Sequence, residues 1–334
     1  TSGRQAHTVS PGLLGIQSGH CATCGRGSHD RGRICITAAG SMSMTLDQFA
    51  TTTRVELTGA EADQFELNGA VADAKATGRT TAFLDLVRNL AVEAGLDTAN
   101  AHAKVTSVNE GPTAAGMASS ASGFAALATA AADAYGLDLS TKDLSRLARR
   151  GSGSASRSLI DRFAIWHAGT SDETSYAEAI DAPEMAMVSV TVNATAKKVS
   201  SRDGMVATRQ TSPYYQAWID VTKQTLEEMI AACAAADFTR IGEITETHAH
   251  RMHAVINATH PPIRYLAPVS WQVFDEVSAM RDDGLEAYAT ADAGPNVVII
   301  CRPDDAQAVA NRVAAYGQIN TFSPGPGAHL MDDA

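Results

Sequence analysis

The chain has 334 residues, 45% of them hydrophobic, which is enough for one large domain or two ordinary domains that share an interface. Its formal net charge of −11 argues against a general nucleic-acid-binding protein, and no apolar stretch is long enough to span a bilayer. Five cysteines without the spacing of a disulfide framework, and no charged-then-apolar signal peptide at the start, indicate reduced thiols in a cytoplasmic protein.

The first forty residues are rich in Gly, Ser and His and show little periodicity. Beyond them, strand-like alternation and helix-like apolar spacing mix without a regular βαβ rhythm, which favours the α+β class. Ser140 with Asp143 resembles a capping box at the start of a helix. The expected strands lie at 51–57, 102–108, 185–192 and twice within 287–300, and the expected helices at 79–95, 124–136, 140–150, 218–235, 238–256, 271–281 and 304–315.

The most informative segment is the Gly- and Ser-rich loop at 112–123, which opens an Ala-rich and strongly helix-forming run. Such a loop presents unpaired N–H groups and the positive end of a helix dipole to an anion, usually phosphate. No Gly-Lys-Ser/Thr follows, so it is not a Walker loop, and the dinucleotide fingerprint is also missing. A flexible loop before an ordinary core helix is the alternative, and spacing alone does not decide between the two.

This loop closely resembles the nucleotide-binding loop of the GHMP kinase superfamily, and within it that of the mevalonate diphosphate decarboxylases. Four further segments resemble the same family in the same order, at 41–47, 150–158, 197–205 and 292–296. The resemblance implies an α+β, GHMP kinase-like fold, with an N-terminal domain like ribosomal protein S5 domain 2 and a C-terminal ferredoxin-like domain. With a turn at 181–183, we expect the nucleotide-binding domain over 1–184 and the ferredoxin-like domain over 185–334.

The function implied by the resemblance is the ATP-dependent decarboxylation of mevalonate 5-diphosphate in isoprenoid biosynthesis. The implied products are isopentenyl diphosphate, ADP, phosphate and carbon dioxide, and the implied cofactors are ATP and Mg²⁺. A homodimer is also implied, whereas no nucleic-acid or membrane partner is expected.

The resemblance also assigns site residues. Asp292 lies near the tertiary 3-hydroxyl of the substrate and assists its phosphorylation, and Arg157 lies near the carboxylate that is lost. The other implied substrate contacts are Ser152, Ser154, Ser201 and Arg202. The implied ATP contacts are Gly116, Ala118, Ser119, Ser120, Ser122, Lys197 and Lys198.

Taken without the resemblance, the same residues leave alternatives open. The run at 151–157 combines hydroxyls with a guanidinium that suits a carboxylate or phosphate, and it is otherwise a polar turn. The run at 197–202 suits a diphosphate, and it is otherwise a solvated basic patch. Asp292 precedes a tight Gly-Pro turn, where it serves as a general base or caps the turn.

The segment at about 9–40 departs from the family pattern. Ala6-His-Thr8 is not followed by the Lys-Tyr-Trp-Gly-Lys signature, and no Tyr, Trp or Lys precedes Lys75. The family uses that signature at the phosphate end of the substrate. The alternatives are therefore a decarboxylase or kinase acting on a related mevalonate phosphate, or a catalytically impaired relative that binds a ligand.

Two groups of His and Cys residues resemble metal ligands only in part. His248, His250 and His253 lie on one expected helix, but the first points well away from the last, and we assign no metal there. A zinc site at Cys21, Cys24 and Cys35 lacks a second clean ligand pair, so we favour a coincidence in a loop.

Overall fold

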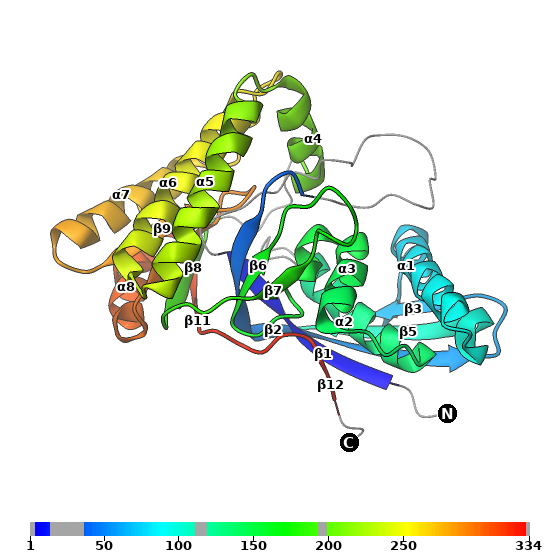
Figure 1. Cartoon of the computed structure of the whole chain (residues 1–334). Coiled ribbons are helices and arrows are strands. Elements are labelled where there is room, and N and C mark those ends of the chain that lie inside the picture. Colours follow the sequence, from blue (N-terminus) through cyan, green and yellow to red (C-terminus); the bar gives the residue numbers. More distant parts are fainter. Residues whose placement is uncertain (1–3, 14–36, 111–118, 193–198, 332–334) are drawn as a thin grey trace.

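The structure is a computed structural model that describes residues 4–13, 37–110, 119–192 and 199–331. It consists of two lobes, each built on one sheet (Figure 1). The elements of the N-terminal lobe are β1 (Arg4–Leu13), β2 (Ser41–Thr58), β3 (Gln64–Leu67), β4 (Ala70–Val71), α1 (Ala74–Glu93), η1 (Asp97–Asn100), β5 (His102–Asn109), α2 (Ser119–Tyr135), α3 (Thr141–Gly151), η2 (Gly153–Ser156), β6 (Phe163–Trp166) and β7 (Ala177–Ala179).

The C-terminal lobe follows, and the chain then returns to the first sheet through its last strand. The elements are β8 (Ala186–Thr191), α4 (Ser201–Thr211), α5 (Tyr215–Ala234), α6 (Phe238–Asn257), α7 (Pro268–Asp282), β9 (Ala287–Ala291), β10 (Val297–Cys301), η3 (Pro303–Asp305), α8 (Ala306–Val313), η4 (Ala314–Tyr316), β11 (Gln318–Phe322) and β12 (His329–Leu330).

The larger sheet has the strand order β12-β1-β2-β5-β3-β4, and β6 and β7 extend it from the first part of β2. Val9 of β1 pairs with Ala50, but Pro11 pairs with Thr45, so β2 bulges between these pairs. Phe49 lies in the bulge with φ 65, in the left-handed region. The bulge separates the part of β2 that pairs with β5 from the part that pairs with β6.

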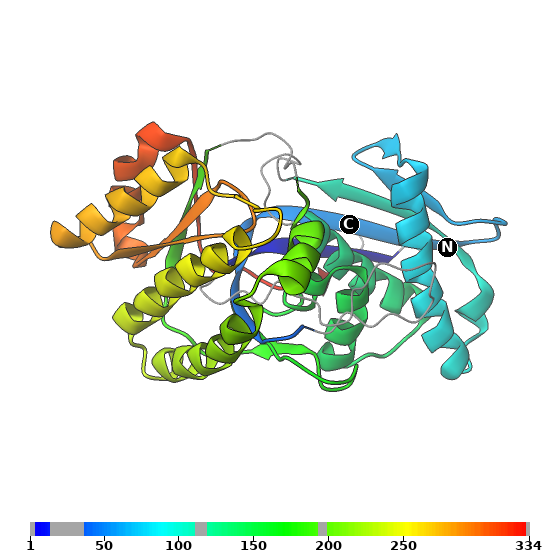
Figure 2. The ribbon, with the colours of Figure 1, turned by 90° about the horizontal axis from the view of Figure 1, so that it is seen from above.

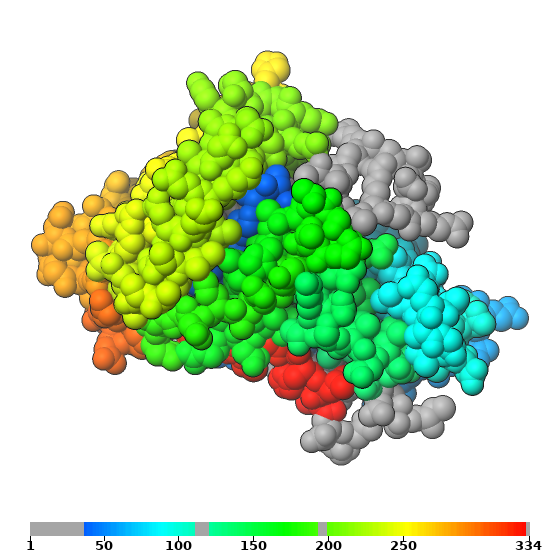
Figure 3. All heavy atoms as spheres, in the orientation of Figure 1, coloured from blue at the N-terminus to red at the C-terminus, as the bar shows by residue number. Residues whose placement is uncertain are grey.

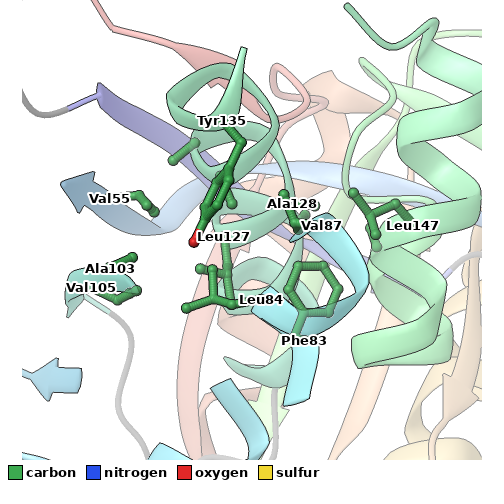
Figure 4. Packing of buried hydrophobic residues seen from close by; sticks show 14 of the residues in the cluster. Val55, Phe83, Leu84, Val87, Ala103, Val105, Leu127, Ala128, Tyr135 and Leu147 are labelled. Atoms are coloured by element: carbon green, nitrogen blue, oxygen red, sulfur yellow. The ribbon is translucent and has the colours of Figure 1, made fainter. Parts of the chain in front are cut away.

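Helices α1, α2 and α3 cover one face of this sheet (Figure 1). Fully buried alanines of α2, such as Ala128 and Ala131, let the helix lie close to the strands. Phe83 and Leu84 of α1 and Leu147 of α3 pack against the same cluster (Figure 4).

The smaller sheet has the order β11-β8-β10-β9, and all neighbouring strands are antiparallel. With helices between β8 and β9 and α8 between β10 and β11, this is the ferredoxin-like arrangement implied by the resemblance. Ala186, Val188 and Val190 face α7 and α8, whereas Met187 faces the other way.

The two lobes share one apolar cluster, which we call the methionine seam. Its methionines come from both sides, with Met42 and Met44 on β2, Met185 and Met187 at β8, and Met229 on α5. Figure 3 shows the blue segment that begins β2 lying between the green N-terminal elements and the yellow-green helices of the C-terminal lobe. The start of β2 therefore belongs to the junction between the lobes.

Every helix and strand predicted from periodicity is present, mostly with ends shifted by a few residues, but the strand expected at 51–57 is the second part of β2, which begins ten residues earlier at Ser41. The predicted cap of α3 is confirmed, because the backbone N–H of Asp143 donates to Ser140 Oγ at 3.1 Å. Sequence analysis missed α4, although its cap repeats that signal, since the N–H of Asp203 donates to Ser200 Oγ at 3.1 Å. It also missed β1, β3, β4, β6, β7, β11 and β12, of which only β1 is longer than five residues. No helix within the described ranges is long and apolar enough to cross a membrane.

Candidate active site

Arg157 follows η2 and is buried, with 5% of its surface exposed. Its Nη1 donates to Ser41 Oγ at 2.5 Å, and its Nε donates to Ser43 Oγ at 3.0 Å. The indole of Trp166 lies 5.5 Å from the guanidinium carbon. Alternation along β2 explains this setting, because Met42 and Met44 face the methionine seam while the intervening serines face the guanidinium.

Burial lowers the pKa of Arg157 well below its ordinary value, to about 10, and the negative charge of Asp292 acts in the opposite direction. The side chain therefore stays protonated at neutral pH. Among the described residues no carboxylate forms an ion pair with it. A buried cation held by two hydroxyls and an aromatic ring is suited to receive an anionic ligand.

Asp292 is the first residue after β9 and is half-buried. A tight turn follows it, in which the N–H of Gly294 donates to the carbonyl of Asp292 at 2.7 Å. The effect of Asp292 on the pKa of Arg157 places these two charges within electrostatic reach, although they come from different lobes. The two candidate residues thus come from different lobes.

Three of the predicted serines meet beside the start of α2. Ser152 Oγ lies 3.4 Å from Ser120 Oγ and 3.4 Å from Ser154 Oγ. Ser122 is placed differently, since it is fully buried with its Oγ 2.8 Å from Thr51 Oγ1 of β2. The hydroxyls of Ser120, Ser152 and Ser154 therefore lie next to one another, whereas Ser122 links the first turn of α2 to β2 through a hydrogen bond.

Two exposed arginines, one from each lobe, interact electrostatically. Arg202 lies in the first turn of α4, and Arg79 lies on α1 with its guanidinium carbon 5.1 Å from the ring centre of Phe124. Partial burial and the positive charge of Arg202 lower the pKa of Arg79. Like positive charges that interact in this way are typical of a site for a polyanion. Figure 2 shows α4 reaching over the middle of the molecule, between the lobes.

Sequence analysis did not identify Ser41, Ser43 or Arg79 as site residues. The alternating Ser-Met-Ser-Met pattern at 41–44 was a usable signal for the serines, because it places two hydroxyls on one face of a strand. Arg79 had no local signal, since its role depends on a residue in the other lobe.

Other predicted residues lie at or beyond the limits of the described chain. Ser201 begins α4, and Ser119 begins α2. The residues outside the described ranges are Gly116, Ala118, Lys197 and Lys198, together with the cysteines Cys21, Cys24 and Cys35. Within those ranges, no group of three His, Cys, Asp or Glu residues is arranged to hold a metal ion, and this includes the histidines of α6.

Family models match both lobes of the chain. Residues 26–177 match the diphosphomevalonate decarboxylase-like N-terminal domain, and residues 186–324 match the mevalonate 5-diphosphate decarboxylase C-terminal domain. A diphosphomevalonate decarboxylase of Candida albicans is 36% identical over 78% of this chain and 75% of its own length. This chain belongs to the diphosphomevalonate decarboxylase family.

Solved structures of the family support the assignment of the fold. The mevalonate diphosphate decarboxylase of Enterococcus faecalis has a TM-score of 0.88 at 39% identity and covers 99% of both chains. That of Staphylococcus aureus has a TM-score of 0.87 at 37% identity, covering 99% of this chain and 98% of its own. MDDEF in complex with MVAPP, AMPPCP and magnesium has a TM-score of 0.89 at 40% identity, again over 99% of both chains. The α+β, GHMP-type fold in two domains is therefore confirmed.

Proposed function

We propose that this chain catalyses the ATP-dependent decarboxylation of mevalonate 5-diphosphate to isopentenyl diphosphate. The observation that carries the proposal is the pair of Arg157 and Asp292, a buried cation and a half-buried carboxylate that come from opposite lobes and interact electrostatically. The reaction needs both groups, because it activates a tertiary hydroxyl and then removes a carboxylate from the neighbouring carbon chain. Membership of the family supports the same reaction.

Asp292 acts at the first step. The 3-hydroxyl oxygen attacks the terminal phosphorus of ATP, its proton passes to the Asp292 carboxylate, and ADP leaves. The turn closed by Gly294 holds the backbone of Asp292, so the carboxylate is positioned before the substrate arrives. Phosphoryl transfer depends on such positioning and on charge neutralisation more than on covalent help.

Arg157 acts at the second step. The 3-phosphate leaves with the electrons of its C–O bond, and positive character develops at C3. The C–C bond to the carboxylate then breaks, its electrons form the new double bond, and carbon dioxide is released. Arg157 holds the carboxylate in place while the charge moves, and its burial strengthens this interaction by excluding water.

The phosphate groups require cations in a protein of net charge −11. Arg79 and Arg202 supply two of them from opposite lobes, so a bound polyphosphate relieves their mutual repulsion and links the lobes. We assign Arg202 and Ser201 to the substrate diphosphate. Ser152 and Ser154 are assigned to the substrate beside Arg157, and Lys197 and Lys198 to the nucleotide phosphates.

ATP and magnesium fit the start of α2. A 17-residue helix begins there, and the hydroxyls of Ser120 and Ser152 lie beside it. Magnesium prefers oxygen ligands and is usually held through substrate phosphates and a few protein groups, which matches this donor set. When bound with ATP, it neutralises phosphate charge during the transfer. We assign Gly116, Ala118, Ser119 and Ser120 to ATP, and Ser122 to the support of that loop.

The finer organisation is also part of the proposal. We place the domain boundary at 184/185, between the two segments that match the family models. We also propose a homodimer in the cytoplasm. Within the described residues Cys233 and Cys301 are buried free thiols, which suits a reducing compartment.

The deciding experiment is an assay with ATP, Mg²⁺ and mevalonate 5-diphosphate that follows ADP, phosphate and carbon dioxide together. Equal release of all three is expected, and mevalonate 5-phosphate serves as the competing substrate. ADP without carbon dioxide would instead indicate a kinase, and no turnover with ATP still bound would indicate an impaired relative. Asp292→Ala should lower turnover sharply with the fold intact, and near-normal turnover would remove the role given to Asp292.

A further inference from the structure

β9, the strand that ends just before Asp292, is an edge strand of the smaller sheet, and among the described strands it pairs with β10 alone. On its other edge, the backbone groups of β9 form hydrogen bonds with side chains from α6 and α7 in place of a neighbouring strand. Arg281 Nη1 donates to the carbonyl of Ala287 at 2.7 Å, and the N–H of Ala289 donates to Glu246 Oε2 at 2.9 Å. We call these bonds, together with the one described next, the side-chain ladder of β9.

The last bond of the ladder is made by His253 of α6. Its Nε2 lies 3.3 Å from the carbonyl oxygen of Ala291. A carbonyl only accepts, so Nε2 carries the proton and donates it. The three bonded positions on β9 are two residues apart, as expected for groups that leave one edge of a strand.

The bond from His253 acts on Asp292 through one planar peptide. The carbonyl of Ala291 and the N–H and Cα of Asp292 lie in the same plane, so fixing the carbonyl fixes the backbone on which the Asp292 carboxylate is mounted. On the other side, the N–H of Gly294 bonds the carbonyl of Asp292. Farther along, Ser270 Oγ donates to the carbonyl of Pro295 at 2.5 Å. The backbone around Asp292 is therefore held on both sides by hydrogen bonds.

The surroundings keep His253 neutral. It is 2% exposed, and burial, with a smaller effect from the nearby His250, lowers its pKa to about 4. Its Nδ1 has no hydrogen-bond partner among the described residues. A neutral ring with the proton on Nε2 donates the bond without placing a positive charge beside Asp292, where it would compete with Arg157.

We propose that His253 is a positioning residue for the reaction, which sets the Asp292 carboxylate by fixing the peptide between Ala291 and Asp292. It touches neither substrate nor nucleotide. The inference rests on the proposed role of Asp292. Because a displacement of about 1 Å costs up to about a hundredfold in rate, a single lost backbone bond is enough to produce a measurable effect.

The first test compares His253→Met with His253→Gln. Methionine fills the space without a donor, whereas the glutamine amide N–H reaches about as far as Nε2. We expect His253→Met to lower kcat by about tenfold or more with KM values for both substrates within about twofold, and His253→Gln to retain most of kcat. Wild-type kcat in His253→Met, or equal loss in both variants, would overturn the proposal.

Arg281→Met is the matched control, because it removes a bond from the same ladder four residues before Ala291. It also breaks the ion pair with Glu246 at 2.7 Å, so it should lower Tm at least as much as His253→Met does. The kcat of Arg281→Met should stay within about twofold of wild type, because the hydrogen bond from His253 to the peptide between Ala291 and Asp292 is kept. A loss of kcat equal to that of His253→Met would show a general effect of the ladder and contradict a special role for His253.

A second measurement does not depend on turnover. Nitrogen NMR of histidine-labelled protein should show one ring with the proton on Nε2, unprotonated Nδ1 and no titration above about pH 5, and this signal should vanish in His253→Gln. A proton on Nδ1, or a charged ring at neutral pH, would refute the hydrogen bond. If the NMR result holds but Asp292→Ala turns over normally, the roles of Asp292 and His253 in catalysis both fail while the bond itself stands.

Discussion

Ser41 accepts a 2.5 Å hydrogen bond from Arg157 Nη1, although 116 positions of the chain separate the two residues. Ser43 accepts the bond from Nε, so one face of β2 holds two of the guanidinium nitrogens. The remaining nitrogen, Nη2, makes no hydrogen bond inside the described part of the chain. β2 therefore orients the buried guanidinium of Arg157 without neutralising its positive charge.

Removing one of these hydroxyls should leave a buried N–H of Arg157 without an acceptor. We expect Ser41→Ala to lower the free energy of unfolding by about 1–3 kcal/mol and kcat by about tenfold. Urea unfolding and steady-state kinetics measure the two effects. Ser189→Ala is the control, since Ser189 is 3% exposed on β8 and its Oγ has no partner among the described residues. Equal losses in both variants would contradict the role given to Ser41.

Arg157 and Arg149 are both buried, but only Arg149 has a carboxylate partner, Asp172 Oδ1 at 2.5 Å. Arg157→Met removes a buried cation that no ion pair stabilises, so the variant should release no carbon dioxide yet keep the wild-type Tm or exceed it. Arg149→Met leaves Asp172 without this partner and should lower stability by about 3 kcal/mol. Thermal unfolding of the two variants side by side tests the contrast, and a larger loss of Tm in Arg157→Met would refute it.

Arg79 should matter for binding more than for chemistry. Arg79 and Arg202 carry like positive charges from opposite lobes, and we assign both to the phosphate groups. Arg79→Gln should therefore raise KM for the phosphate-bearing substrates by about tenfold while kcat falls less. The ionic-strength dependence of kcat/KM should also weaken. Arg209, later on α4 and exposed, offers a control of the same residue type. An Arg79→Gln variant with unchanged KM would remove Arg79 from the site.

The packing of α6 on β9 depends on Gly242. A Cβ at this position would lie 1.9 Å from Cδ2 of Tyr288, so Gly242→Ala should push the helix off the strand and cost about 1–3 kcal/mol. A Cβ added at Gly78 on α1 would meet no atom of the described chain within 4 Å, and Gly78→Ala should instead stabilise by about 0.5–1 kcal/mol through helix propensity. Unfolding curves of the two variants should shift in opposite directions, and a shared direction would contradict this account.

His253 makes stability depend on pH in the acid range. Its pKa falls from 6.5 in the unfolded chain to about 4 in the fold, so the unfolded state binds more protons between these values. Stability is complete above about pH 6.5 and decreases by up to about 3 kcal/mol as the pH falls through 4. Asp63 has a lowered pKa and loses its contribution at lower pH still. Urea unfolding at pH 7 and 4.5 should show a smaller difference in His253→Gln, and an unchanged difference would contradict the assignment.

The sequence predicted the fold well because periodicity is a local property. The helices α5 to α8 of the C-terminal lobe and the cap of α3 at Ser140 could be predicted from windows of a few residues, although α4 was missed. Short strands such as β6 and β7 could not, since their pairing with distant parts of the sheet decides them. The site shows the same limit. Arg157 and Asp292 stand in segments with their own pattern, whereas Arg79 and His253 gain a role only from residues in other elements.

The methionine seam makes the active centre depend on both lobes and on methionines that stay reduced. Arg157 and Asp292 belong to the two lobes that this cluster joins, so the packing of Met42 and Met44 with Met187 and Met229 determines how the two charged residues are placed relative to each other. Thioether side chains are pliable, which allows small sliding movements, but oxidation to sulfoxides makes them polar. An oxidant that reaches the methionine seam would therefore abolish activity without modifying any residue assigned to the substrate. Neither lobe expressed alone would carry a working centre, so the chain behaves as one indivisible catalytic unit.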